Sequence, residues 1–204
     1  MQDFHIPLYP GGIFHVLSHA VGNELLFRND ENYRFFLQKY NSYINPIADT
    51  YCYSLLPNHF HFMIRIKEEN AIRTHFENIK RGKELKDAPD FIMNCFSNFL
   101  NSYAKSYNKV YKRKGALFVD YLRRVEVNND PQFGSTIFYI HKNPVHHGFC
   151  NDISGWNWTS YKIFLSKSPT LLLRDDVLDW FGGLEQFIQY HNQPIFLKGA
   201  AELE

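Results

Sequence analysis

Two histidines flank a single phenylalanine, His59-Phe60-His61, inside the apolar run LPNHFHFMIRI. The aromatic and β-branched residues of this run predict a strand over 59–67, and alternate side chains of a strand point to one face. Both imidazoles would then project side by side, at a spacing that suits two ligands of one metal ion, while Phe60 and Phe62 pack on the other face. A pair of partly buried, hydrogen-bonded histidines is the alternative interpretation of this motif.

A second group of chemically capable residues lies about eighty positions later, in FYIHKNPVHHGF. Tyr139 and Asn143 are four residues apart on a predicted helix, so their side chains share a face. The amide oxygen of Asn143 could complete a metal site begun by the two histidines. Tyr139 would lie one turn away, with its hydroxyl within reach of a group bound there. Taken alone, Tyr139 also fits an ordinary core aromatic.

A basic segment lies between these two motifs. Seven positive residues and one negative residue, Asp120, occur between Lys105 and Arg124, although the whole chain has a net charge of only +1. The positive residues are Lys105, Lys109, Lys112, Arg113, Lys114, Arg123 and Arg124. This uneven distribution favours an anionic partner, and a solvated helix face is the other interpretation.

Hydrophobic periodicity and turn residues predict the elements that must position these groups. Strands are expected at 11–22, 50–56, 59–67 and 116–127, and helices at 29–49, 70–80 and 91–115, with a polar loop at 81–90. A further helix should be capped by Asp130, carry Pro131 at its first position and end at Pro144.

The order of these elements predicts an α+β fold, in which a ferredoxin-like antiparallel sheet has helices packed on it. SKSPT (166–170) is the best linker candidate, and two short helices broken at Gly182-Gly183 follow it. We therefore expect a domain over 1–165 and a helical C-terminal extension over 166–204.

Composition bounds the class of protein. The chain has 204 residues, of which 45% are hydrophobic and 17% aromatic, enough for a sizeable core. The three cysteines are widely spaced, and neither a signal peptide nor an apolar run of about 18 residues is evident. These features favour a cytoplasmic protein that is not inserted in a membrane.

The motifs, in their order along the chain, resemble the single-tyrosine HUH endonucleases, and especially the transposases of small insertion sequences and the REP-associated tyrosine transposases. His59-Phe60-His61 matches the family's His-hydrophobic-His motif, Tyr139 its nucleophilic tyrosine, and Asn143 its third metal ligand. The segments YNKVYKRKGALF and WNWTSY also look like parts of that family, and the resemblance covers about residues 11–165.

The resemblance implies the HUH endonuclease fold and a metal-dependent DNA nicking and rejoining enzyme. Mg²⁺ or Mn²⁺ would be held by His59, His61 and Asn143, and Tyr139 would form a 5′-phosphotyrosine and release a 3′-OH. The partner would be single-stranded or hairpin DNA, contacted by the basic segment, and the protein could act as a homodimer.

One departure concerns the first strand, where the family often carries an arginine and this chain has Ser18 and His19. His15 and His19 are candidates for the base that deprotonates Tyr139, although satisfied strand histidines explain them as well. Two other functions remain open. One is a non-catalytic DNA-binding protein derived from a transposon. The other is a histidine phosphoesterase, which would need a second His-x-Ser/Thr motif that the sequence lacks.

Overall fold

The computed structural model describes residues 5–119 and 122–193. Its elements, in chain order, are β1 (Ile13–His19), α1 (Asp30–Tyr43), β2 (Ala48–Leu56), β3 (His59–Ile66), α2 (Glu69–Ile79), α3 (Ala88–Val110), β4 (Arg123–Glu126), α4 (Asp130–His146), α5 (Tyr161–Phe164), α6 (Arg174–Phe181) and α7 (Leu184–His191).

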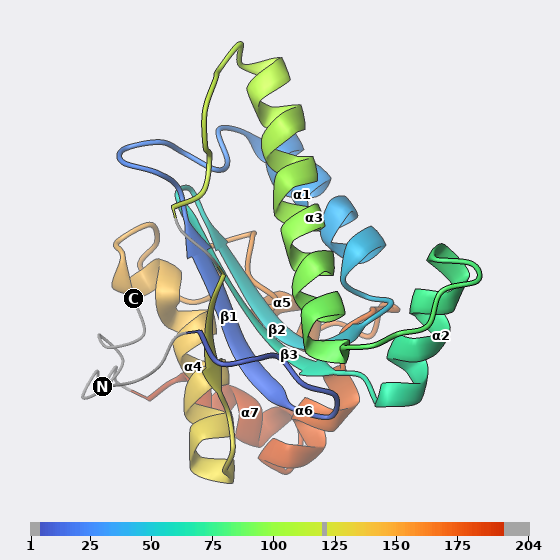
Figure 1. Cartoon of the computed structure of the whole chain (residues 1–204). Coiled ribbons are helices and arrows are strands. Elements are labelled where there is room, and N and C mark those ends of the chain that lie inside the picture. The colour runs from blue at the N-terminus through green and yellow to red at the C-terminus, as the bar shows by residue number, and fades with distance from the viewer. Residues whose placement is uncertain (1–4, 120–121, 194–204) are drawn as a thin grey trace.

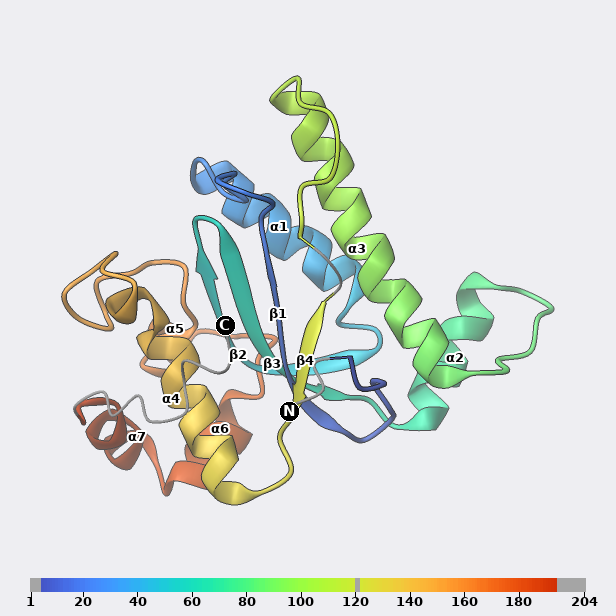
Figure 2. The same ribbon diagram turned by 60° about the vertical axis from the view of Figure 1, so that its left-hand side comes forward.

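The four strands form one antiparallel sheet in the order β2-β3-β1-β4 (Figure 1). This is the strand order of a ferredoxin-like split βαβ arrangement, so the predicted fold class is confirmed. Helices α1 and α3 cover one face of the sheet, and α4, α6 and α7 lie on the other (Figure 2). Among the described helices, none is long and apolar enough to cross a membrane.

Alternation along β3 divides its side chains between the two layers, as predicted. Phe60 and Phe62 join the core beneath α1, where the Phe62 ring stacks on Tyr40 with the centroids 4.1 Å apart. His59 and His61 point to the opposite face, toward α4. The sheet therefore places both imidazoles on the side that carries the predicted tyrosine helix.

Two helices on the first face differ from their predicted bounds. Helix α1 is capped by Asn29 and ends at Tyr43 rather than at residue 49, because Pro46 lies just beyond and disfavours helical geometry before it. Helix α3 begins at Ala88, since the Asp87 side chain accepts a hydrogen bond from the backbone of Asp90. It ends at Val110, and Lys112 already has a left-handed backbone, so the helix stops before the predicted residue 115.

The strand predicted over 116–127 is much shorter in the structure. In the described part of this segment, the regular ladder with β1 covers Arg123–Glu126, and Phe118 forms a single bridge to Ala20. The Val119 and Val127 amides add one hydrogen bond each, to the carbonyls of His19 and Ile13. Residues 120–121, which fall in the predicted strand, lie outside the described residues.

Helix α4 was mispredicted at both ends. Asn129, not Asp130, is the cap, because its extended backbone lets its side chain accept a hydrogen bond from the Gln132 amide at 2.9 Å. The helix also passes through Pro144 and ends at His146. Proline removes one amide donor without ending this helix, because the surrounding residues are buried against the sheet and α7.

Two short helices broken at Gly182-Gly183 were predicted, and α6 and α7 confirm them. Val177 and Phe187, both fully buried, share a core cluster with Ile137 and Ile140 of α4. The C-terminal helices therefore hold the outer side of α4. The domain boundary after residue 165 stays a prediction.

Candidate active site

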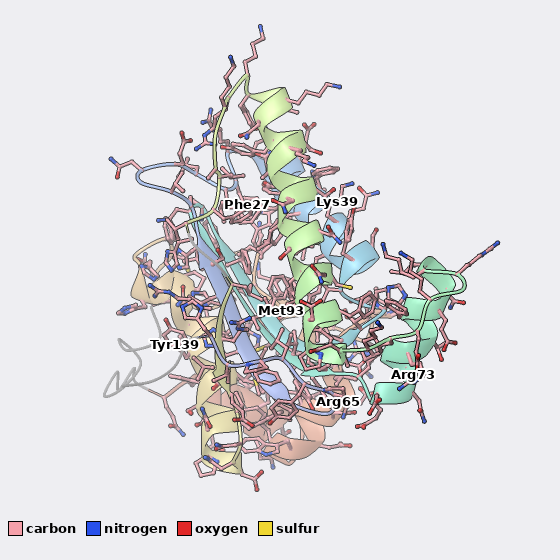
Figure 3. The ribbon with its side chains drawn as sticks, viewed as in Figure 1. Phe27, Lys39, Arg65, Arg73, Met93 and Tyr139 are labelled. Carbon is pink, nitrogen blue, oxygen red and sulfur yellow. The ribbon has the colours of Figure 1, made fainter. Side chains whose placement is uncertain are left out.

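The structure brings the four predicted site residues to one place between β3 and α4. His59 Nε2 lies 3.2 Å from Asn143 Oδ1, and the rings of His61 and Tyr139 meet edge to face with centroids 5.7 Å apart. The two histidine rings lie 5.1 Å apart. Figure 3 labels Tyr139 on the α4 side of the sheet. Residues more than seventy positions apart in sequence therefore share a single site.

His59 lies between two acceptor oxygens. Its Nδ1 is 2.8 Å from Asn58 Oδ1, and its Nε2 faces Asn143 Oδ1. Burial lowers the pKa of His59 to about 3, with smaller effects from His19 and His147, so the ring is neutral near pH 7. A neutral imidazole carries only one N–H. With both amide oxygens facing the ring, His59 can therefore donate a hydrogen bond to Asn58 or to Asn143, but not to both.

His61 is held from behind by a histidine of β1. His15 Nε2 lies 2.9 Å from His61 Nδ1, and burial lowers the pKa of His15 to about 3 and holds that of His61 well below its usual value. The Nε2 atom of His61 has no hydrogen-bond partner among the described residues. A proton on Nδ1, donated to His15, leaves a lone pair on Nε2 of His61.

Tyr139 is enclosed by the same histidines. Its ring meets His15 and His61 edge to face, with centroids 5.9 and 5.7 Å away, and the residue is 6% exposed. Tyr139 also belongs to the apolar cluster between the sheet and α4. The ring is thus positioned by packing, next to the imidazole that carries the free lone pair.

Two further histidines extend the site beyond the predicted set. The His19 ring stacks on His59 with a centroid separation of 4.6 Å, because the two residues are directly paired across β1 and β3. His147 caps the C-terminal end of α4, and the centroid of its ring lies 4.9 Å from that of His59. The spacing of His15 and His19 in one strand signals a shared face, whereas the approach of His147 depends on helix α4 continuing through Pro144.

The donor set fits a small divalent cation. His59 Nε2 lies 3.2 Å from Asn143 Oδ1, His61 Nε2 has no partner among the described residues, and both rings are neutral. With the His59 proton on Nδ1, where Asn58 accepts it, His59 Nε2 and Asn143 Oδ1 would both offer lone pairs to a metal. Nitrogen and amide oxygen donors of this kind suit Mn²⁺ better than Mg²⁺. In the described part of the chain, no three His, Cys, Asp or Glu side chains are arranged to hold a metal, so a site here requires the amide of Asn143.

The predicted basic residues divide into two groups. Four lysines are exposed, on α3 and in the loop that follows it: Lys105, Lys109, Lys112 and Lys114. Arg113 instead pairs with Glu24 at 2.9 Å and donates to the Ala116 carbonyl at 2.6 Å, and Arg124 is only 6% exposed. Arg123, on β4, is half-buried. The arginines of the segment are thus more enclosed than its lysines.

The exposed lysines belong to a projecting part of the molecule. In both ribbon views the C-terminal end of α3 extends beyond the end of the sheet at which the β2–β3 hairpin turns (Figures 1 and 2). His59 is the first residue of β3, directly after that turn. The projection and the histidine site therefore lie toward the same end of the sheet.

Comparison with known proteins shows a shared fold. No protein-family model matches the chain, and no curated protein matches it in sequence. A solved structure of a REP-associated tyrosine transposase bound to a REP hairpin superposes with a TM-score of 0.57 at 15% sequence identity. The match covers 83% of this chain and 89% of that chain. Nearly the whole of the transposase chain thus has a counterpart in this fold.

Proposed function

We propose that this protein is a transposase-like, metal-dependent endonuclease and strand-transferase that acts on single-stranded or hairpin DNA. The observation that carries the proposal is the convergence of His59 and His61 from β3 with Tyr139 and Asn143 from α4. The fold shared with a tyrosine transposase that binds a DNA hairpin supports the same assignment.

In this proposal the chain binds and orients one phosphodiester. The two neutral imidazoles and the Asn143 amide would hold Mg²⁺ or Mn²⁺, which when bound neutralises charge on the phosphate and makes it a better electrophile. Asn58 and His15 fix the two rings by accepting their Nδ1 hydrogens. With a pKa of about 3, His15 is poorly suited to remove a proton near pH 7, so we assign it this orienting role.

Tyr139 would act as the nucleophile. Its hydroxyl oxygen attacks phosphorus, a Tyr–O–P bond forms, and the bond from phosphorus to the 3′ oxygen breaks. The tyrosine proton is lost, and the departing oxygen gains a proton to become a free 3′-OH. Because the covalent link retains the energy of the phosphodiester, a second 3′-OH can reverse the reaction without ATP.

The test is adduct formation with labelled oligonucleotides. The full chain is incubated with Mn²⁺ and a set of hairpins that carry single-stranded flanks, and products are separated under denaturing conditions. Label on the 3′ side of the nick should become protein-linked, and the 5′-labelled fragment should be released with a 3′-OH. Linkage to the 5′-labelled fragment would show that a different residue or chemistry is at work.

A second candidate is a DNA-binding protein that no longer cleaves. The observation that favours it is the burial of Tyr139, since a nucleophile must be reached by DNA. Such a protein should bind the hairpins with an affinity that falls steeply with salt. It should yield no adduct with Mn²⁺ or Mg²⁺ at any oligonucleotide sequence tried.

A further inference from the structure

A chain of buried polar groups crosses the molecule from β2 to α7 through helix α4. Its three side chains, Ser160, His141 and His191, each have 0% exposure. His141 Nδ1 lies 3.0 Å from His191 Nε2, and His141 Nε2 lies 2.8 Å from Ser160 Oγ. Buried polar groups that are fully paired specify one arrangement of the elements that carry them.

The direction of donation along this chain follows from its ends. Burial lowers the pKa of His191 to about 4 and that of His141 well below its usual value, so both rings are neutral. His191 Nδ1 donates to the Phe187 carbonyl at 2.8 Å, which makes its Nε2 the acceptor for His141 Nδ1–H. The Ser160 hydroxyl has one hydrogen and two acceptors in reach, His141 Nε2 at 2.8 Å and the Tyr53 carbonyl at 3.2 Å, and the shorter contact to the unprotonated Nε2 takes it. The Ser160 oxygen accepts the Tyr53 amide at 2.9 Å.

His141 occupies the position between the two site residues of α4. Tyr139 and Asn143 share the face that meets β1 and β3, and a residue two positions from each lies near the opposite side of a helix. The helix is therefore fixed from behind by His141 while its front presents Tyr139 and Asn143 to the histidines of the sheet.

This part of α4 needs such support. Pro144 has no amide hydrogen, so the carbonyl of Ile140 lacks its usual partner four residues later in the helix. The missing backbone hydrogen bond lies in the helical turn that separates Tyr139 from Asn143. Tertiary contacts must then hold the turn in place, and the polar chain supplies directional ones.

We propose that His191, acting through His141 and Ser160, is a positioning residue that sets the placement of α4 in the site. The consequence for DNA cleavage rests on the proposed function, whereas the placement of the helix does not. In this proposal the C-terminal helices contribute to the site, because α7 places His191 against the side of α4 that faces away from the sheet histidines.

Three substitutions separate positioning from general stability. His191→Leu keeps bulk but leaves His141 Nδ1–H without an acceptor. His191→Gln retains an acceptor, since the glutamine amide oxygen can take the place of Nε2. Val177→Ala, in α6, opens a cavity in the same apolar cluster without touching the polar chain.

Hydrogen exchange tests the placement of the helix without any activity. At a temperature where every variant is fully folded, the amides of residues 139–143, 145 and 146 should exchange about tenfold faster in His191→Leu than in Val177→Ala, because a buried donor is left without its partner. His191→Gln should resemble the wild type. Ser160→Ala breaks the chain at its other end and replaces His191→Leu if that variant does not fold. Equal protection of α4 in the polar-chain and Val177 variants would overturn the proposal.

Adduct kinetics test the catalytic consequence. In a single-turnover reaction, His191→Leu should form the adduct about 10²-fold more slowly at unchanged oligonucleotide affinity, since small misplacements of reacting groups cost rates of this order. Val177→Ala should keep the wild-type rate. A wild-type protein that forms no adduct would contradict the proposed function, and hydrogen exchange alone would then decide the role of His191.

Discussion

At the scale of single residues, the proposed role of Tyr139 as nucleophile depends on its hydroxyl group, whereas a role as a core aromatic depends only on its ring. Tyr139→Phe keeps the ring that contacts His15 and His61 and removes only the oxygen. We expect the variant to fold, bind Mn²⁺ and bind hairpin DNA as the wild type does, yet form no denaturant-resistant adduct. Gel analysis with a 3′-labelled oligonucleotide measures the loss.

A matched control is available in the same apolar cluster. Tyr51 is 4% exposed and also lies on the α4 side of the sheet, so Tyr51→Phe removes a hydroxyl from a comparable environment. Its adduct yield should stay normal. An unchanged yield from Tyr139→Phe would show that the tyrosine is only a core aromatic.

The metal assignment makes a separate residue-scale prediction. His59→Ala and His61→Ala should each abolish Mn²⁺ binding measured by calorimetry, and with it adduct formation, because each removes one of only two imidazole donors. His75→Ala, on α2 away from the site, serves as control. Undiminished cleavage by wild type in EDTA would rule out a metal-dependent reaction.

At the scale of elements, the projecting end of α3 should bind the DNA backbone. Replacing Lys109, Lys112 and Lys114 by glutamine should weaken binding to all sequences alike. The salt slope of log affinity should fall by about 0.7 for each single-strand phosphate that these lysines neutralise in the wild type. Fluorescence anisotropy over a salt titration measures both effects.

The control for this prediction carries the same change in charge. Lys80, Lys83 and Lys86 are also exposed, near the opposite end of α3, and their replacement by glutamine should leave the slope unchanged. Arg113 is unsuitable for the test because its pairing with Glu24 gives it a structural role. Equal slopes for both triple variants would mean that the α3 lysines only interact with solvent.

Much of this arrangement could be predicted from local patterns. Alternation in β3 and four-residue spacing in α4 predict which side chains share a face, and both expectations match the structure. Local rules failed where tertiary packing determines the end of a helix. Helix α4 continues through Pro144 because the flanking residues are buried. The hydrogen bond between His141 and His191 joins residues fifty positions apart, and no spacing rule reaches that far.

At the scale of the whole molecule, buried histidines should make stability depend on pH. The pKa of His191 is about 4 in the folded chain and 6.5 as its ordinary value, so below 6.5 the unfolded state binds more protons. Stability is complete above that value and falls by up to about 1.4 kcal/mol per pH unit, for this group, as pH drops toward 4. His15 and His59 act in the same direction.

Urea unfolding at about pH 7 and about pH 5 measures this loss. His191→Gln removes one titrating group, so its free energy of unfolding should fall less steeply between the two pH values than that of the wild type. Identical slopes for the two proteins would show that His191 does not contribute to the acid sensitivity.

Among the described residues, the backbone of the outer edge of β2 is hydrogen-bonded to segments that follow it by about a hundred residues. The Leu55 amide donates to Trp158, the Ser160 amide to Tyr53, and the Leu173 amide to Thr50. During synthesis this edge therefore stays unpaired until about a hundred further residues have been made. An unpaired strand edge can pair with another chain and so promote aggregation. A chain truncated after residue 165 would lack the Leu173 hydrogen bond and the helices that cover α4, and we expect it to self-associate in light-scattering measurements. A monomeric, stable truncated chain would instead support a domain boundary at that point.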